Sequence, residues 1–98
     1  MAPWTFLTNH AVVLMYVARN PDARLRDIAA HAGITERAVQ QIVRDLVEAG
    51  YMTSTRVGRR NTYQVHDTAP MRHPTQRHRD VGALLALIDS DQALGQEA

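Results

Sequence analysis

Polar side chains with hydrogen-bonding ends recur along one side of the segment from residue 36 to residue 49. At the 100° step of an α-helix, the outward side carries Arg37, Gln41, Arg44 and Glu48, with Gln40 at its edge. Arginine can donate two hydrogen bonds to guanine, and glutamine can form a two-point pair with adenine. These residue types at helical spacing therefore suit contact with base edges, and the alternative is an ordinary solvated helix face.

A second group of cations follows in the stretch VGRRNTY, from Val57 to Tyr63. Arg59 and Arg60 stand between two runs rich in Thr, Tyr and Val, which cover residues 51–57 and 61–65 and favour β-strands. Because a short glycine-containing segment joins these runs, we expect a β-hairpin with both arginines at its tip. Arginine suits phosphate and guanine, so this tip is a candidate contact for a polyanion.

The charges are distributed unevenly, although the formal net charge of the 98-residue chain is only +1. Residues 1–52 carry five arginines and five acids, and residues 53–79 carry six arginines against Asp67 alone. Residues 80–98 carry four acids and no arginine or lysine. Since the local field is what a ligand meets, a basic block beside a neutral half indicates an anionic partner.

Apolar periodicity predicts two helices ahead of the polar segment. The first is capped by Thr8 or Asn9 and stops before the turn signal Asn20-Pro21-Asp22. The second covers residues 25–32 and stops at Gly33, because glycine accepts the left-handed conformation that ends helices. We also expect residues 23–25 to add an extended piece to the hairpin.

A third helix is predicted from residue 36 to residue 49, with Thr35 as its cap. Its inner face consists of Val39, Ile42, Val43, Leu46 and Ala49. Two helices joined by three or four residues that include glycine have the spacing of a helix-turn-helix. With the hairpin, the fold class is therefore mainly α (α+β), a winged helix-turn-helix with a three-helix core, a β-hairpin wing and a C-terminal helix.

The segment after His66 divides into a connector at 67–74, a predicted apolar helix at 75–89 and an acidic tail at 90–98. We expect residues 1–66 to form the folded domain. The apolar residues without a place in its core are Trp4, Phe6, Val81, Leu84, Leu85, Leu87 and Ile88. They predict a homodimer interface, and packing of the last helix onto its own chain is the alternative.

Several classes of chemistry are excluded or disfavoured by the sequence. No cysteine is present, which removes thiol catalysis, disulfides and cysteine-based metal sites. No nucleophile–base spacing or glycine-rich phosphate loop indicates an enzyme, and we expect no cofactor. His66, His73 and His78 with Asp67 or Asp80 lack a recognisable metal-ligand spacing. The longest apolar run, residues 11–18, is too short to span a membrane, so we expect a cytoplasmic protein.

The stretch from Leu25 to Tyr63 resembles the winged helix-turn-helix transcriptional regulators of bacteria, the broad MarR and ArsR-like group. The matching text runs from "LRDIAAHAGITERAVQQIVRDLVEAGY" into the hairpin, and the resemblance extends over about residues 8–66. It implies a regulator that binds double-stranded DNA sequence-specifically as a homodimer. The implied recognition helix covers residues 35–49 and enters the major groove, and the implied wing covers residues 57–62 and contacts phosphates or the minor groove.

The resemblance also assigns roles to individual residues. The implied major-groove set is Thr35, Glu36, Arg37, Gln40, Gln41 and Arg44, and the implied wing set is Arg56, Arg59, Arg60 and Asn61. Two other functions stay open: a winged-helix module that binds proteins without DNA, and an ArsR-like repressor that responds to a metal bound by His and Asp. The operator, the regulated genes, the direction of regulation and any small-molecule effector are not encoded in a recognisable pattern.

Overall fold

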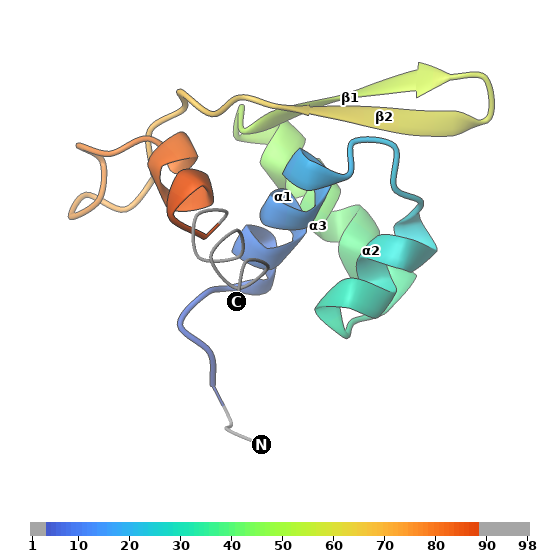
Figure 1. Ribbon diagram of the computed structural model, residues 1–98, viewed down its shortest axis with the longest axis horizontal. Coiled ribbons are helices and arrows are strands. Elements are labelled where there is room, and N and C mark those ends of the chain that lie inside the picture. The colour runs from blue at the N-terminus through green and yellow to red at the C-terminus, as the bar shows by residue number, and fades with distance from the viewer. Residues whose placement is uncertain (1–3, 89–98) are drawn as a thin grey trace, which may run out of the picture. The chain divides into compact units, whose positions relative to one another are not determined.

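Figure 1 shows the computed structural model of the protein, which describes residues 4–88. The chain divides after Val65 into two compact units, and each unit is described by itself. The first unit contains three helices and a β-hairpin, and the second contains a series of turns followed by helical residues 81–88. None of the helices in the described range is both long and apolar enough to cross a membrane.

The three helices of the first unit are α1 (Asn9–Arg19), α2 (Leu25–Ala32) and α3 (Glu36–Glu48). The Thr8 hydroxyl accepts a hydrogen bond from the Ala11 amide at the start of α1. The Thr35 hydroxyl accepts the corresponding bond from the Ala38 amide at the start of α3, over 3.0 Å. These caps satisfy amides that lack partners in the first helical turn, so the predicted starts of both helices are confirmed.

A left-handed glycine makes the turn between α2 and α3. Gly33 has φ 72°, and its amide donates to the Ala29 carbonyl, which closes the end of α2. Only Ile34 and Thr35 then separate this glycine from the first residue of α3. Because a side chain at positive φ is strained, glycine allows α3 to start within three residues at a new angle.

Each of the three helices contributes at least one buried apolar residue to a common core. The least exposed large side chains of this unit are Val13, Val17, Ile28, Val39 and Met52. The inner face of α3 agrees with the predicted one except at its end, because Ala49 is the C-cap residue and is exposed. The outward residues of α3 are exposed to solvent.

The hairpin consists of β1 (Met52–Val57) and β2 (Arg60–Val65), which pair antiparallel from Met52 opposite Val65 to Val57 opposite Arg60. The connecting turn is only two residues long, Gly58 and Arg59, with Gly58 at φ 64°. Glycine at the first central position matches the tight turns that suit the twist of paired strands. The predicted connection, residues 58–60, was therefore one residue too long, because Arg60 already belongs to the strand.

The loop between α1 and α2 is attached to β2 by hydrogen bonds. The Tyr63 amide donates to the Pro21 carbonyl over 2.9 Å, and the Arg60 guanidinium donates to the Asp22 carbonyl over 2.8 Å. The predicted third strand at residues 23–25 is absent from the described part, where the sheet has two strands. A third strand does not form because Pro21, just before it, has no amide hydrogen to donate to a strand ladder. The predicted strand would also overlap α2, which begins at Leu25.

In the second unit, helical structure begins at residue 81 and not at residue 75 as predicted. Asp80 is the reason for this start, because its carboxylate accepts a hydrogen bond from the Ala83 amide in the manner of a helix cap. Residues 75–80 are polar throughout and form turns, since they have no apolar face to bury. The predicted end of this helix at 89 and the tail at 90–98 lie outside the described residues.

Candidate nucleic-acid interface

The outer face of α3 forms a shallow hollow of about 520 Å³. Its lining residues are Thr35, Arg37, Ala38, Gln40, Gln41 and Arg44. Five of the six predicted major-groove residues therefore lie together, and all five are exposed. The buried residues of α3 lie on the other side of the helix, so this polar face is turned toward solvent.

A chain of hydrogen bonds links the polar residues of this face. The Arg44 guanidinium donates to the Gln41 side-chain oxygen over 3.1 Å, and the Gln41 amide donates to Asp45 over 2.9 Å. Both ends of the Gln41 amide are thus occupied, and a two-point contact of Gln41 with adenine requires these bonds to break. Arg44 keeps most of its five N–H donors, which makes it the better base reader of the two.

Asp45 also binds a residue from another helix. His10 Nε2 of α1 lies 2.8 Å from Asp45 Oδ2. The hydrogen bond with His10, followed by the one from Gln41, holds the pKa of the Asp45 carboxyl below its usual value of 3.8. The carboxylate is therefore ionised at neutral pH, and it orients Gln41 and, through Gln41, Arg44. Neither His10 nor Asp45 was predicted as a site residue, because the two are brought together only by the packing of α1 on α3.

A second hollow, of about 430 Å³, lies between the start of α2 and the hairpin. Its lining residues are Ala23, Arg24, Leu25, Arg26, Glu36, Arg59, Arg60, Asn61 and Tyr63. Four arginines face one carboxylate here, so the hollow suits an anion such as a phosphate group. Glu36 lines this second hollow, whereas the other predicted major-groove residues line the hollow on the outer face of α3.

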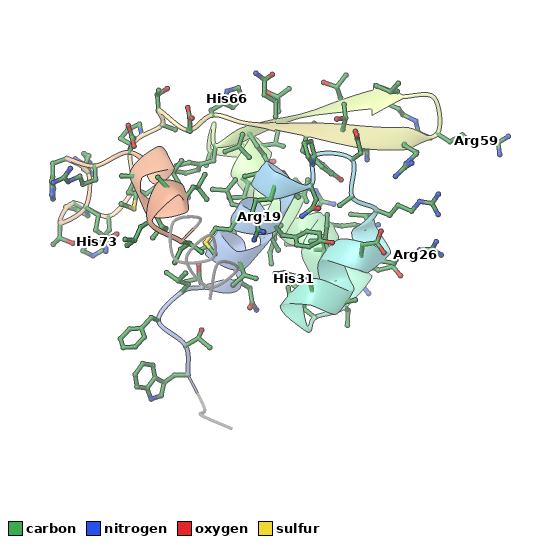
Figure 2. The ribbon with its side chains drawn as sticks, viewed as in Figure 1. Arg19, Arg26, His31, Arg59, His66 and His73 are labelled. Atoms are coloured by element: carbon green, nitrogen blue, oxygen red, sulfur yellow. The ribbon has the colours of Figure 1, made fainter. Side chains whose placement is uncertain are left out.

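Arg24 and Arg26 line this hollow but were not predicted as site residues. They flank half-buried Leu25, and both are themselves exposed. Figure 2 shows the Arg26 side chain on the same side of the first unit as the hairpin tip. The sequence could have indicated these residues, because two arginines stand at the start of the first helix of the helix-turn-helix. Only the folded hairpin places them beside the wing arginines.

The two adjacent arginines of the wing have different surroundings. Arg59 occupies the turn, and Figure 2 shows its side chain pointing away from the helices. Arg60 is tied to the Asp22 carbonyl, as described above. Arg56 folds back onto the turn through a bond from its Nε to the Gly58 carbonyl, and Asn61 lies opposite Arg56 in the strand register. Arg59 is therefore the wing arginine best placed to meet a ligand, while Arg60 also serves the fold.

The apolar residues predicted at a dimer interface fall into three groups by exposure. Trp4, Phe6 and Leu87 are 63%, 92% and 60% exposed, and the Trp4 and Phe6 rings meet edge to face at 5.1 Å. Val81 and Leu85 are only 6% and 9% exposed in the single chain. Leu84 and Ile88 are half-buried. The apolar surface that remains open in one chain is thus smaller than the predicted set.

The histidines do not gather around a common point. No group of three or more His, Asp or Glu side chains in the described range is arranged to hold a metal ion. His31 stacks on Tyr16 with ring centroids 4.4 Å apart, and His73 Nδ1 lies 2.8 Å from the Thr75 hydroxyl. These contacts give both rings roles in packing and turn formation.

Comparison with known proteins decides the family. The sequence profile described as MarR family matches residues 5–60, which is more than half of the chain. The chain belongs to the MarR family. MarR-family proteins are transcription regulators, and the family and the winged helix-turn-helix fold predicted from the sequence are confirmed for this chain. A search of curated proteins gives no match.

Solved structures are also similar to this MarR-family chain. One is MepR, a transcription regulator of the Staphylococcus aureus multidrug efflux pump MepA, with a TM-score of 0.57 and 17% identity. The match covers 93% of this chain and 64% of the MepR chain, so the chain spans less than two thirds of that relative. Another is a possible transcriptional regulator for arsenical resistance, at TM-score 0.46 and 24% identity, covering 94% of this chain and 98% of that one.

Proposed function

We propose that this MarR-family chain is a sequence-specific regulator that binds double-stranded DNA in the cytoplasm as a homodimer. The observation that carries the proposal is the pair of hollows on the first unit: one lined by the polar face of α3, the other by four arginines. In this proposal the recognition helix, residues 35–49, enters the major groove. The wing, residues 57–62, contacts phosphates or the adjoining minor groove.

Within the major groove, Arg37 and Arg44 are the proposed base readers. Both are exposed, line the same hollow and carry the fork of donors that matches guanine. Gln40 lines the same hollow, and none of the hydrogen bonds described among the polar residues of α3 uses its amide. Thr35 acts mainly through the cap that fixes the start of α3, and Gln41 acts mainly by holding Arg44.

On the phosphates, the proposed contacts are Arg59 of the wing together with Arg24 and Arg26 at the start of α2. They line one hollow with Arg60, and guanidinium groups bind phosphate oxygens in a two-point manner. Such contacts fix the position of the helix on the duplex without reading its sequence. The proposal therefore assigns affinity to this hollow and specificity to the α3 hollow.

A homodimer is proposed because Trp4, Phe6 and Leu87 leave large apolar side chains open to solvent in the single chain. Two-fold pairing is the commonest assembly of soluble proteins. In a dimer, the two recognition helices would read half-sites about one helical turn apart. The rival function, a protein-binding winged helix, gives no reason for arginines on both the α3 face and the wing.

The test is a selection of bound genomic fragments followed by fluorescence anisotropy on the best duplex, with a shuffled duplex of equal composition as control. The proposal expects the selected duplex to bind at least about 1,000 times more tightly than the shuffled one, as specific regulators do. Arg37→Ala should cost about 1–3 kcal/mol on the selected duplex and change the preferred base at one position. Equal binding of both duplexes by the unmodified protein would refute sequence-specific regulation.

A further inference from the structure

The segment from Pro70 to Asp80 in the second unit is closed at its base by backbone hydrogen bonds. Pro70 and Asp80 form an isolated antiparallel bridge, and the Met71 amide donates to the Arg79 carbonyl over 3.0 Å. Just outside it, the Val81 amide donates to the Ala69 carbonyl over 2.9 Å. We call residues 70–80 the closed loop. Its ends lie side by side, so it projects as one compact element.

Hydrogen bonds inside the closed loop also fix its course. The Gln76 amide donates to the His73 carbonyl, and the Arg79 amide donates to the Gln76 carbonyl, each over 2.9 Å. The Thr75 amide donates to the His73 ring. Because the backbone is already ordered, a ligand that binds here does not have to meet the full entropy cost of ordering the loop.

The closed loop presents a strongly basic surface. Residues 72–80 are all exposed, and they include Arg72, Arg77 and Arg79 together with two histidines. The only acid among them is Asp80, whose carboxylate is engaged by the Ala83 amide. Among the described residues, the ion pair is the one between His10 and Asp45. Within this part of the chain, Arg72, Arg77 and Arg79 therefore form no ion pair. Three guanidinium groups on one ordered loop are thus available to an anion.

We infer that the closed loop is a second phosphate-binding surface, which contacts the backbone of the same duplex as the first unit and adds affinity without reading sequence. The inference rests on the proposed DNA-binding function. Five residues, 66–70, separate the end of β2 from Met71, and a fully extended chain of that length reaches at most about 20 Å. The connector therefore keeps the loop within that reach of Val65, which lies at the end of the hairpin away from the turn.

A nucleic-acid backbone fits this surface better than a lipid surface does. Binding within a membrane interface needs exposed apolar side chains beside the cations. Within the described range, the closed loop exposes no large apolar side chain, and its Met71 is half-buried. Regularly spaced phosphates require only cations, and arginine is the cation whose planar fork matches them.

The test compares the salt dependence of DNA binding in three proteins: the unmodified chain, R72A/R77A/R79A and the charge-matched control R72K/R77K/R79K. Each is titrated with a random duplex and with the selected duplex between 50 and 200 mM salt. If each arginine neutralises one phosphate, the slope of log affinity against log salt should fall by about 2 to 3 in the alanine protein on both duplexes. The lysine protein should keep most of the slope, and far-UV circular dichroism should show that all three proteins are folded.

An unchanged slope in a folded R72A/R77A/R79A protein would overturn the inference, as would an equal loss in the lysine protein. The single variant R77A, expected to lower the slope by about 1, gives the decision if the triple variant does not fold. Loss of binding to anionic lipid vesicles with an unchanged DNA slope would assign the loop to membranes and also overturn it. The random duplex distinguishes this inference from the proposed sequence-specific function. The salt slope measured on it depends on the loop arginines whether or not the protein prefers a sequence.

Discussion

His10 and Asp45 are 35 positions apart in the sequence, yet His10 Nε2 lies 2.8 Å from Asp45 Oδ2. This contact ties the start of α1 to α3, on the same side of α3 as Gln41. Asp45 thereby connects the scaffold to Arg44, the residue proposed to read bases. Its behaviour with pH and on mutation gives a direct measure of that connection.

The Asp45 carboxyl should titrate below its usual pKa, and removal of its partner should reverse this. The folded pKa is lowered chiefly by the His10 hydrogen bond. The stabilisation is therefore fully present above the usual, unfolded pKa of 3.8 and is lost as the pH falls through the folded value. Carboxyl carbon NMR should show the Asp45 pKa rising in His10→Ala. The control His31→Ala, on α2, should leave the pKa of Asp45 where it is, and an unchanged value in both variants would contradict the prediction.

The two wing arginines should respond differently to substitution. Arg59→Ala should weaken binding to every duplex and lower the salt slope by about 1, with the melting temperature unchanged, because Arg59 lies in the exposed turn. Arg60→Ala should also lower the melting temperature, because it removes the bond to the Asp22 carbonyl. Thermal denaturation and anisotropy measure the two effects separately. Equal melting temperatures for both variants would mean that the bond to Asp22 contributes nothing to the fold.

Thr35→Ala should destabilise the first unit by about 1 kcal/mol, since the Ala38 amide loses its capping oxygen. Thr35→Ser keeps that oxygen and is the matched control. Urea denaturation followed by circular dichroism measures the difference between the two variants. If serine and alanine destabilise the protein equally, the cap is not the reason for threonine at this position.

Two neighbouring leucines of the second unit should separate assembly from folding. Leu87→Arg should shift the protein toward monomer in analytical ultracentrifugation while its fold persists, because Leu87 is 60% exposed in the single chain. Leu85→Ala should instead destabilise the fold by about 2–5 kcal/mol, because Leu85 is buried. A Leu87→Arg protein with the same sedimenting mass as the unmodified chain would place the dimer interface elsewhere or exclude a dimer.

Local patterns were sufficient to predict the three helices, their caps and the existence of the hairpin. Thr35 was identified as a cap, and Thr8 as one of two candidates with Asn9, because capping depends on a hydrogen bond from an amide three residues later. Gly33 was identified as a stop because its conformational freedom is a property of the residue itself. The burial of Val39, Ile42 and Leu46 followed from helical periodicity in the same way.

The tertiary structure decided what depends on contacts between distant segments. The meeting of His10 with Asp45, the bond from Arg60 to Asp22 and the placement of Arg24 beside the wing join residues that are far apart in sequence. No local preference encodes these contacts, since they follow from the angles at which α1, α2 and the hairpin pack. The sequence by itself thus determined the fold class and the polar face of α3. Packing between distant segments decided that Arg60 is held by the Asp22 carbonyl and that Asp45, one helical turn from Gln41 on α3, is tied to His10.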